Sequence, residues 1–125
     1  MNILKSIVYI ILILSVSTLL ADEIKSTKEG GRWNDSATWI GGVVPSAKDD
    51  VVIFGFVNSR SDECNKITIA ESGCLNVESG ITQVHSILIN KGYVKVNENS
   101  TLKVKEIKNE AKDSFYNFGV IEVGE

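Results

Sequence analysis

The chain has 125 residues, in which 13 lysines and arginines face 16 aspartates and glutamates, giving a net charge of −3 at pH 7. Binding to nucleic acids or to anionic membranes needs clustered positive charge, and the sequence contains no Lys- or Arg-rich run. Composition therefore argues against a nucleic-acid partner, and the length suits a single small domain.

The first 21 residues have the features of a secretory signal peptide. Residues 1–5 carry one lysine, residues 6–20 (SIVYIILILSVSTLL) carry no charge, and Ala21 precedes the first acidic residues. A charged start, an apolar run and a small residue at a polar border are the parts of such a signal. The run is shorter than the roughly 20 residues that cross a bilayer. We predict a signal-peptide helix over 1–21, cleaved after Ala21. An uncleaved anchor and a buried helix are the alternatives.

Cleavage would leave residues 22–125 as one domain that is secreted, periplasmic or exposed at the cell surface, with no stable membrane span. Short alternations of apolar and polar residues fill this domain, and two apolar residues two positions apart lie on one side of a strand. Gly, Asn and Ser separate them, as turns require. The alternations, which predict an all-β fold, lie at residues 51–53, 67–69, 75–77, 87–89, 94–96, 102–104 and 121–123.

A five-residue frame, Gly-x-apolar-x-Val, repeats along the domain at Gly73, Gly92 and Gly119, and Ser100 begins a similar copy with Ser in place of Gly. The glycines are 19 and 27 residues apart. Spacing near 20 favours a solenoid whose coils bury their apolar faces by stacking. The frame predicts two interior columns, Leu75–Val94–Ile121 and Val77–Val96–Val123. It also predicts two exterior columns, Cys74–Tyr93–Val120 and Asn76–Lys95–Glu122.

The longer of the two intervals holds a polar segment, residues 105–117 (KEIKNEAKDSFYN). We expect it to be an insertion that forms a short helix or a protruding loop. Insertions in repeat proteins commonly lie on one face, often the binding face. Tyr93 and the two aromatics that end the segment, Phe115 and Tyr116, are therefore candidates for ligand binding.

Two cysteines, Cys64 and Cys74, lie ten residues apart. In an exported chain they form either a disulfide or a pair of unrelated small residues, and without a neighbouring His or third Cys they make no zinc site. His85 has no catalytic partner at a familiar spacing, and we expect it in a solvated turn. Asp35, Asp49 and Asp50 are interpreted as turn-forming acids rather than calcium ligands, so we predict no metal and no cofactor.

Residues 31–53 (GRWNDSATWIGGVVPSAKDDVVI) contain two tryptophans six positions apart, then a Gly-Gly pair, a proline and an Asp-Asp pair before a strand. Residues 33–45 and 49–53 resemble the opening of the eight-glycine domain and its bacterial secreted and surface relatives, in which W-x-D-x-x-T-W-x-G-G-x-V-P precedes D-D-V-x-I. The resemblance implies a short right-handed parallel β-helix with a Trp-rich N-terminal cap on a secreted or surface protein. The cap would be residues 22–50 and the coils residues 51–125. The residues assigned to the cap are Trp33, Trp39, Gly41, Gly42 and Pro45.

These features predict a secreted, non-catalytic β-solenoid module with a structural, adhesive or glycan-contacting role. Its partner would be a glycan or a cell-surface protein. The alternative is the N-terminal part of a polysaccharide-cleaving β-helix enzyme, whose groove would need several more coils. The final alternation, residues 121–123, would expose an open strand edge, and we expect self-association through this C-terminal coil.

Overall fold

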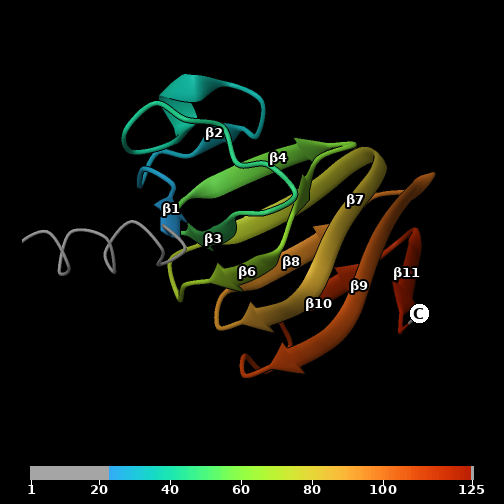
Figure 1. Ribbon diagram of the computed structural model, residues 1–125. Helices are drawn as coiled ribbons and strands as arrows, with labels where there is room; N and C mark the ends of the chain where they lie inside the picture. The colour runs from blue at the N-terminus through green and yellow to red at the C-terminus, as the bar shows by residue number, and fades with distance from the viewer. Residues whose placement is uncertain (1–22, 125) are drawn as a thin grey trace, which may run out of the picture.

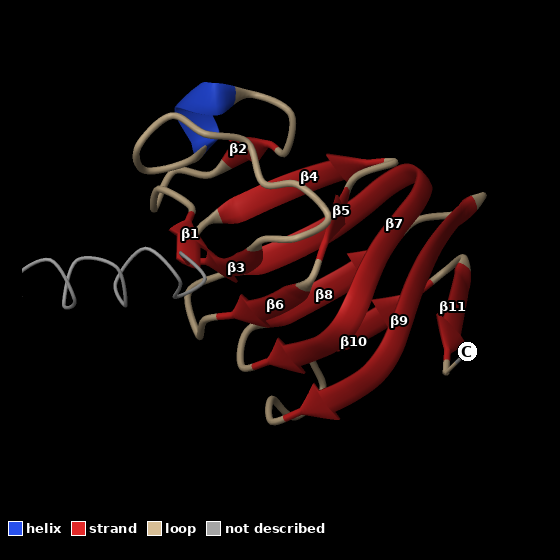
Figure 2. Ribbon diagram, viewed as in Figure 1, coloured by secondary structure: helices blue, strands red, loops and turns tan. Residues whose placement is uncertain are grey.

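The computed structural model describes residues 23–124 as a β-solenoid of about four turns, with strands stacked in parallel (Figure 1). The predicted signal peptide, residues 1–21, lies outside the described residues. Apart from one 3-10 turn, η1 (Ser36–Thr38), the described chain contains strands and loops (Figure 2). None of its segments is a helix long and apolar enough to span a membrane. The all-β solenoid prediction is confirmed.

Eleven strands of the described residues make up the stack, and each pairs in parallel with a strand of a neighbouring coil. One long strand, β7, pairs with the strands before and after it and bends sharply along its length (Figure 1). The strands are β1 (Glu23–Lys25), β2 (Gly31–Arg32), β3 (Asp50–Ile53), β4 (Phe56–Arg60), β5 (Glu63–Cys64), β6 (Lys66–Ile69), β7 (Cys74–Asn90), β8 (Tyr93–Val96), β9 (Ser100–Asn109), β10 (Phe115–Asn117) and β11 (Val120–Val123).

Three faces form each coil, as the burial along β7 shows. Its inward side chains come in three pairs, at residues 75 and 77, 82 and 84, and 88 and 90, and exposed or half-buried residues mark the two bends between them. The first face comprises β2, β4, residues 74–79, β8 and β10. The second comprises β5, residues 80–84 and 100–104, and β11. The third comprises β1, β3, β6, and residues 87–90 and 106–109.

The core consists of inward side chains that stack in register from coil to coil. The first face contributes the column Val57–Leu75–Val94–Phe115, and the third face contributes Ile24–Val51–Ile67–Leu88–Ile107. Branched aliphatic side chains dominate these columns because they pack well against the same residue type one strand away. The predicted neighbours Leu75–Val94 and Val77–Val96 are confirmed.

The third member of each predicted column is wrong. Ile121 and Val123 pair with Leu102 and Val104 on the second face, and Phe115 and Asn117 follow Val94 and Val96. The outward columns change in the same way, because Val120 pairs with Thr101 and Glu122 with Lys103, whereas Tyr116 follows Lys95.

Two different corners of the solenoid use the same glycine frame, which explains the error. A Cβ at Gly92 would collide with the carbonyl oxygens of Ala70 and Gly73, at the corner that leads into the first face. A Cβ at Gly119 would collide with the carbonyl oxygens of Asn97 and Ser100, at the corner that leads into the second face. Close approach of the backbone requires glycine at both corners, and a local frame does not distinguish them.

The predicted insertion at residues 105–117 is also wrong, since this segment completes an ordinary coil. Residues 105–109 continue β9, and Phe115–Asn117 form β10. A tight turn joins the two strands, with Asp113 at φ 51° and the Ser114 hydroxyl donating to the Ala111 carbonyl at 2.7 Å. Val94 to Phe115 is therefore one turn of 21 residues, and no helix or protruding loop interrupts it.

The disulfide alternative is wrong, because both cysteines are free. Ten residues are about half a coil here, so the two side chains occupy different faces. Cys64 lies inward on the second face, paired with Val84, and Cys74 lies outward on the first face, paired with Tyr93. Burial raises the pKa of the Cys64 thiol far above its ordinary value, which keeps it protonated.

The N-terminal segment with η1 and β2 lies at one end of the stack (Figure 1). Trp33 and Trp39 are both buried in the core there, with their rings edge to face at 5.2 Å between centroids. The Trp39 indole Nε1 donates to the Trp33 carbonyl at 2.7 Å. Gly41 and Gly42 turn the chain at φ 93° and 72°, a region that favours glycine, and Pro45 is buried before β3.

Candidate ligand-binding face

The exposed aromatic side chains of residues 23–124 all lie on the outer surface of the first face or at its edge. Phe56 is 49% exposed, Tyr93 37%, Tyr116 41% and Phe118 60%. The first three belong to β4, β8 and β10, and Phe118 follows β10 directly. Clustered exposed apolar groups mark interaction sites more often than isolated ones do. We call these four residues the aromatic platform.

Tyr93 and Tyr116 form the centre of the aromatic platform. Their rings stack with centroids 4.9 Å apart and planes 25° from parallel. The Tyr116 hydroxyl donates to the Asp113 carbonyl at 3.1 Å, which holds this ring against the turn. Burial is the main cause that raises the pKa of Tyr93, so its phenol stays neutral at physiological pH. The structure thus brings together two of the three residues predicted to bind ligand. It places the third, Phe115, inward against the core.

Phe56 belongs to the same surface because of the coil register. Phe56 pairs with Cys74, and Cys74 pairs with Tyr93, so these three outward residues form one column along the solenoid axis. Cys74 is half-buried, and burial raises the pKa of its thiol to about 11 although the charge on Lys95 lowers it. The column therefore presents two aromatic rings separated by a short, uncharged side chain.

Polar side chains form a second outward column on the first face, two residues further along each strand. It contains Asn58, Asn76 and Lys95 in register. Asn76 Nδ2 donates to Asn58 Oδ1 at 2.7 Å, and Asn76 is 9% exposed. Its Oδ1 is the buried side-chain polar atom that finds no hydrogen-bond partner among the described residues. Lys95 Nζ lies 5.9 Å from the centre of the Phe118 ring, within range of a cation–π contact.

The charges at the edge of the first face are largely paired. Arg60 donates to both carboxylate oxygens of Glu78 at 3.0 Å, and these hydrogen bonds lower the pKa of the Glu78 carboxyl. A fork of this kind fixes both side chains geometrically, although an exposed pair adds little stability. Lys95 makes no ion pair among the described residues. The face is therefore aromatic and amide-rich, with two cations that form no ion pair among the described residues: Lys95 near its centre, and Arg32, which pairs with Asn58 at the start of the same column.

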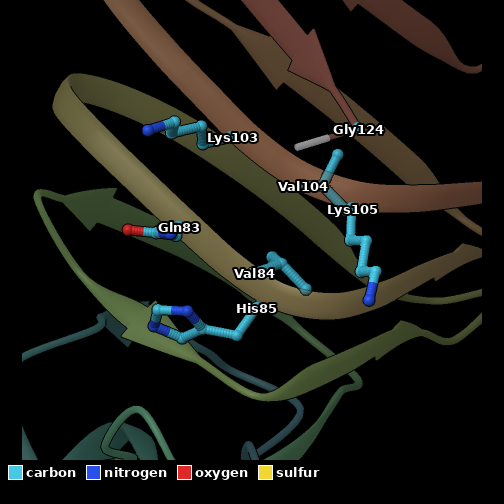
Figure 3. A pocket seen from close by; sticks show the side chains of 7 residues that line it. All are labelled: Gln83, Val84, His85, Lys103, Val104, Lys105 and Gly124. Carbon is cyan, nitrogen blue, oxygen red and sulfur yellow. The ribbon is translucent and has the colours of Figure 1, made fainter.

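A hollow of about 320 Å³ on another side of the solenoid is the main competing site. Its lining residues are Gln83, Val84, His85, Lys103, Val104, Lys105 and Gly124. Figure 3 shows the amino groups of Lys103 and Lys105 directed away from each other, so the two cations do not converge on one ligand. His85 lies 3.3 Å from the Glu63 carboxylate and is exposed. We therefore favour the aromatic platform.

The three aspartates weighed as calcium ligands have local roles. Asp35 caps η1 by accepting from the Ala37 amide at 3.0 Å. Asp49 accepts from the Ser46 amide at 2.8 Å, and Asp50 accepts from the Asn65 amide group at 2.8 Å. Within residues 23–124, His, Cys, Asp and Glu side chains form no group of three that could hold a metal ion.

Two members of the aromatic platform, Phe56 and Phe118, were not predicted from the sequence. Phe56 follows Gly55, where a Cβ would collide with the Thr27 and Lys28 carbonyl oxygens, so Gly55-Phe56-Val57 is another copy of the corner frame. That copy ends in Ser59 rather than Val and was not recognised for this reason. A glycine followed directly by an outward-facing aromatic residue is the sequence pattern that could have identified Phe56.

Comparison with known proteins adds no assignment: no family model, no curated protein and no solved structure matches this chain.

Proposed function

We propose that this chain is a secreted, non-catalytic β-solenoid module of the cell surface whose first face contacts glycans. The observation that carries the proposal is the stacked Tyr93–Tyr116 pair, exposed on a regular sheet beside a column of amide side chains. Sugar rings present flat surfaces of C–H groups, which pack on aromatic faces, and their hydroxyls need polar partners at the edge. The aromatic platform offers aromatic rings, and the side-chain amides of Asn58 and Asn76 are groups of the kind that pair with sugar hydroxyls.

Three further features support a binding role over a catalytic one. The acid on this face, Glu78, is held in its pair with Arg60, which keeps its pKa low and makes it a poor proton donor. The phenol of Tyr93 has a raised pKa, which makes it a poor base near neutral pH. A flat sheet surface also suits an extended ligand, whereas small substrates are usually enclosed in concave sites.

Secretion is supported by the signal-like residues 1–21, and the resemblance of residues 33–53 to secreted β-helix proteins points the same way.

The test is a binding screen of the purified protein against immobilised polysaccharides, with a double variant Tyr93→Ala/Tyr116→Ala. We expect the variant to bind at least tenfold more weakly, about 1.4 kcal/mol, because both rings are lost from the contact. The matched control is Ile81→Ala, which removes an exposed apolar side chain of similar exposure from the second face. Equal affinity of the double variant and the control would refute the role of the first face.

A further inference from the structure

We propose that the first face binds an extended, β-linked polysaccharide lying along the solenoid axis, with Phe56 and Tyr93 beneath alternate sugars. This proposal rests on the glycan-contacting role and adds the class of glycan, its direction and the length needed for full contact.

The spacing of the rings carries the inference. Phe56 and Tyr93 lie in one column with Cys74 between them, and so are two strands apart. Neighbouring strands are about 4.8 Å apart, so the two rings are separated by about 10 Å along the axis. An extended β-linked hexose chain advances by a similar length for each pair of sugars, and it presents the same ring face at every second sugar. An α-linked chain curves and does not keep this repeat.

The residue between the two rings allows such a chain to lie flat. Cys74 has a short side chain that is half-buried and, with its raised pKa, uncharged. A long or charged residue there would lift the ligand from both rings. Tyr116 is in register with Lys95 and stacks on one face of the Tyr93 ring at 4.9 Å, so it widens the apolar surface diagonally in the next coil. The column from Phe56 to Tyr93 thus crosses three successive coils in one direction, and Tyr116 lies in the fourth coil in register with Lys95.

The polar column fixes the same direction. Asn58, Asn76 and Lys95 run parallel to the aromatic column, displaced by two residues along the strands, or about 7 Å. A sugar seated over the rings would turn one edge toward this column. Asn76 Oδ1 is buried and out of reach of a ligand on this face, whereas Lys95 is half-buried and has no ion pair among the described residues, so the donor that the column offers a sugar is the Lys95 ammonium.

The perpendicular direction is less favourable for a chain of sugars. Along a single strand of the first face the outward residues change character at each step. In β4 they are aromatic Phe56, amide Asn58 and the ion-paired Arg60. A ligand across the strands would meet one ring and then charged groups, whereas along the axis it meets rings on one side and polar groups on the other.

Calorimetric titration of the purified full chain with two oligosaccharide series tests the proposal. The probes are β-1,4-linked and α-1,4-linked glucose oligomers of two to six sugars. We expect the affinity for the β-linked series to rise about tenfold or more between two and four sugars, and the α-linked series to bind more weakly at every length. Phe56→Ala should abolish the gain with length, and Phe56→Tyr should restore it. Ile81→Ala serves as the control.

Distinct outcomes separate this proposal from the broader one. Affinity that does not depend on length, equal binding of both series, or a length dependence that survives Phe56→Ala would overturn the axial arrangement. Binding to other polysaccharides in the screen, with none to the β-linked series, would also overturn it and leave the glycan-contacting role standing. Loss of all glycan binding in the screen would remove both.

Discussion

Replacing Val94 with aspartate tests the inward columns, because Val94 is 0% exposed and lies between Leu75 and Phe115. At pH 7 the new carboxyl must bury a charge without a partner or take up a proton. Protonating an acid of ordinary pKa near 3.9 at pH 7 costs about 4 kcal/mol, at about 1.4 kcal/mol per pH unit. Burying the neutral acid and losing the valine contacts add about 3 kcal/mol more. The sum is comparable with the total stability of a small domain, about 5–15 kcal/mol.

The assay is urea denaturation followed by circular dichroism at pH 7 and pH 4.5. The folded-state pKa of the buried carboxyl is raised, so its destabilising effect is largest above that pKa and falls as the pH approaches the unfolded value. We expect Val94→Asp to be largely unfolded at pH 7 and to recover a substantial part of its stability at pH 4.5. Lys95→Asp, one residue on and facing outward, should cost under about 1 kcal/mol. Equal losses at the two positions, or no recovery at low pH, would refute the in–out assignment.

Three further predictions concern other parts of the chain. Mass spectrometry of the protein isolated from its native cells should find a new N-terminus at or within a few residues of Asp22, and a retained Met1 in a cytoplasmic form would contradict export. Burial raises the pKa of Asp62 above its ordinary 3.8, although hydrogen bonds from the Arg60 amide and the Ser59 hydroxyl lower it, so the ionised form of Asp62 is disfavoured in the folded state. The wild-type protein should therefore gain stability relative to Asp62→Asn as the pH falls from 7 toward 4. A stability difference that stays constant over this pH range would contradict this prediction. The last coil leaves its inward apolar residues partly or fully exposed and carries nearly balanced charge, so we propose that a second copy of the chain packs against this end. Light scattering should show dimers or larger species, and Ile121→Lys should shift them toward monomer. A wild-type protein that is monomeric at high micromolar concentration would exclude this self-association. These inward residues are Ile107, Phe115, Ile121 and Val123.

The periodicity of the sequence predicted the architecture because it reflects a local rule. Two apolar residues two positions apart face the same side of a strand, and glycine is required where the backbone of one coil touches the next. These rules are sufficient to place Leu75 over Val94 and to predict stacked coils. They do not specify which corner a given glycine occupies, so Gly119 was assigned to the wrong face.

The candidate site was predictable in part, because strand alternation shows which side chains face outward but not which coils bring them together. The alternation of β8 places Tyr93 outward, and Tyr116 was singled out by its position at the end of a segment that proved to be β10. Phe56 lies 37 residues before Tyr93, and the two meet only through the register of two successive coils. The spacing of the two cysteines allowed a disulfide that does not form, because a separation of ten residues is half a coil and places Cys64 and Cys74 on different faces.

The most direct measurement of the central claim is a nitrogen-15 NMR titration of the purified protein with a polysaccharide that it binds in the screen. We expect the amide signals that move to belong to the first face, at β4, β8 and β10 and at residues 74–79, and the signals of the second and third faces to stay unchanged. Shifts centred instead on the hollow beside Lys103 and Lys105, or distributed over all three faces, would contradict the claim.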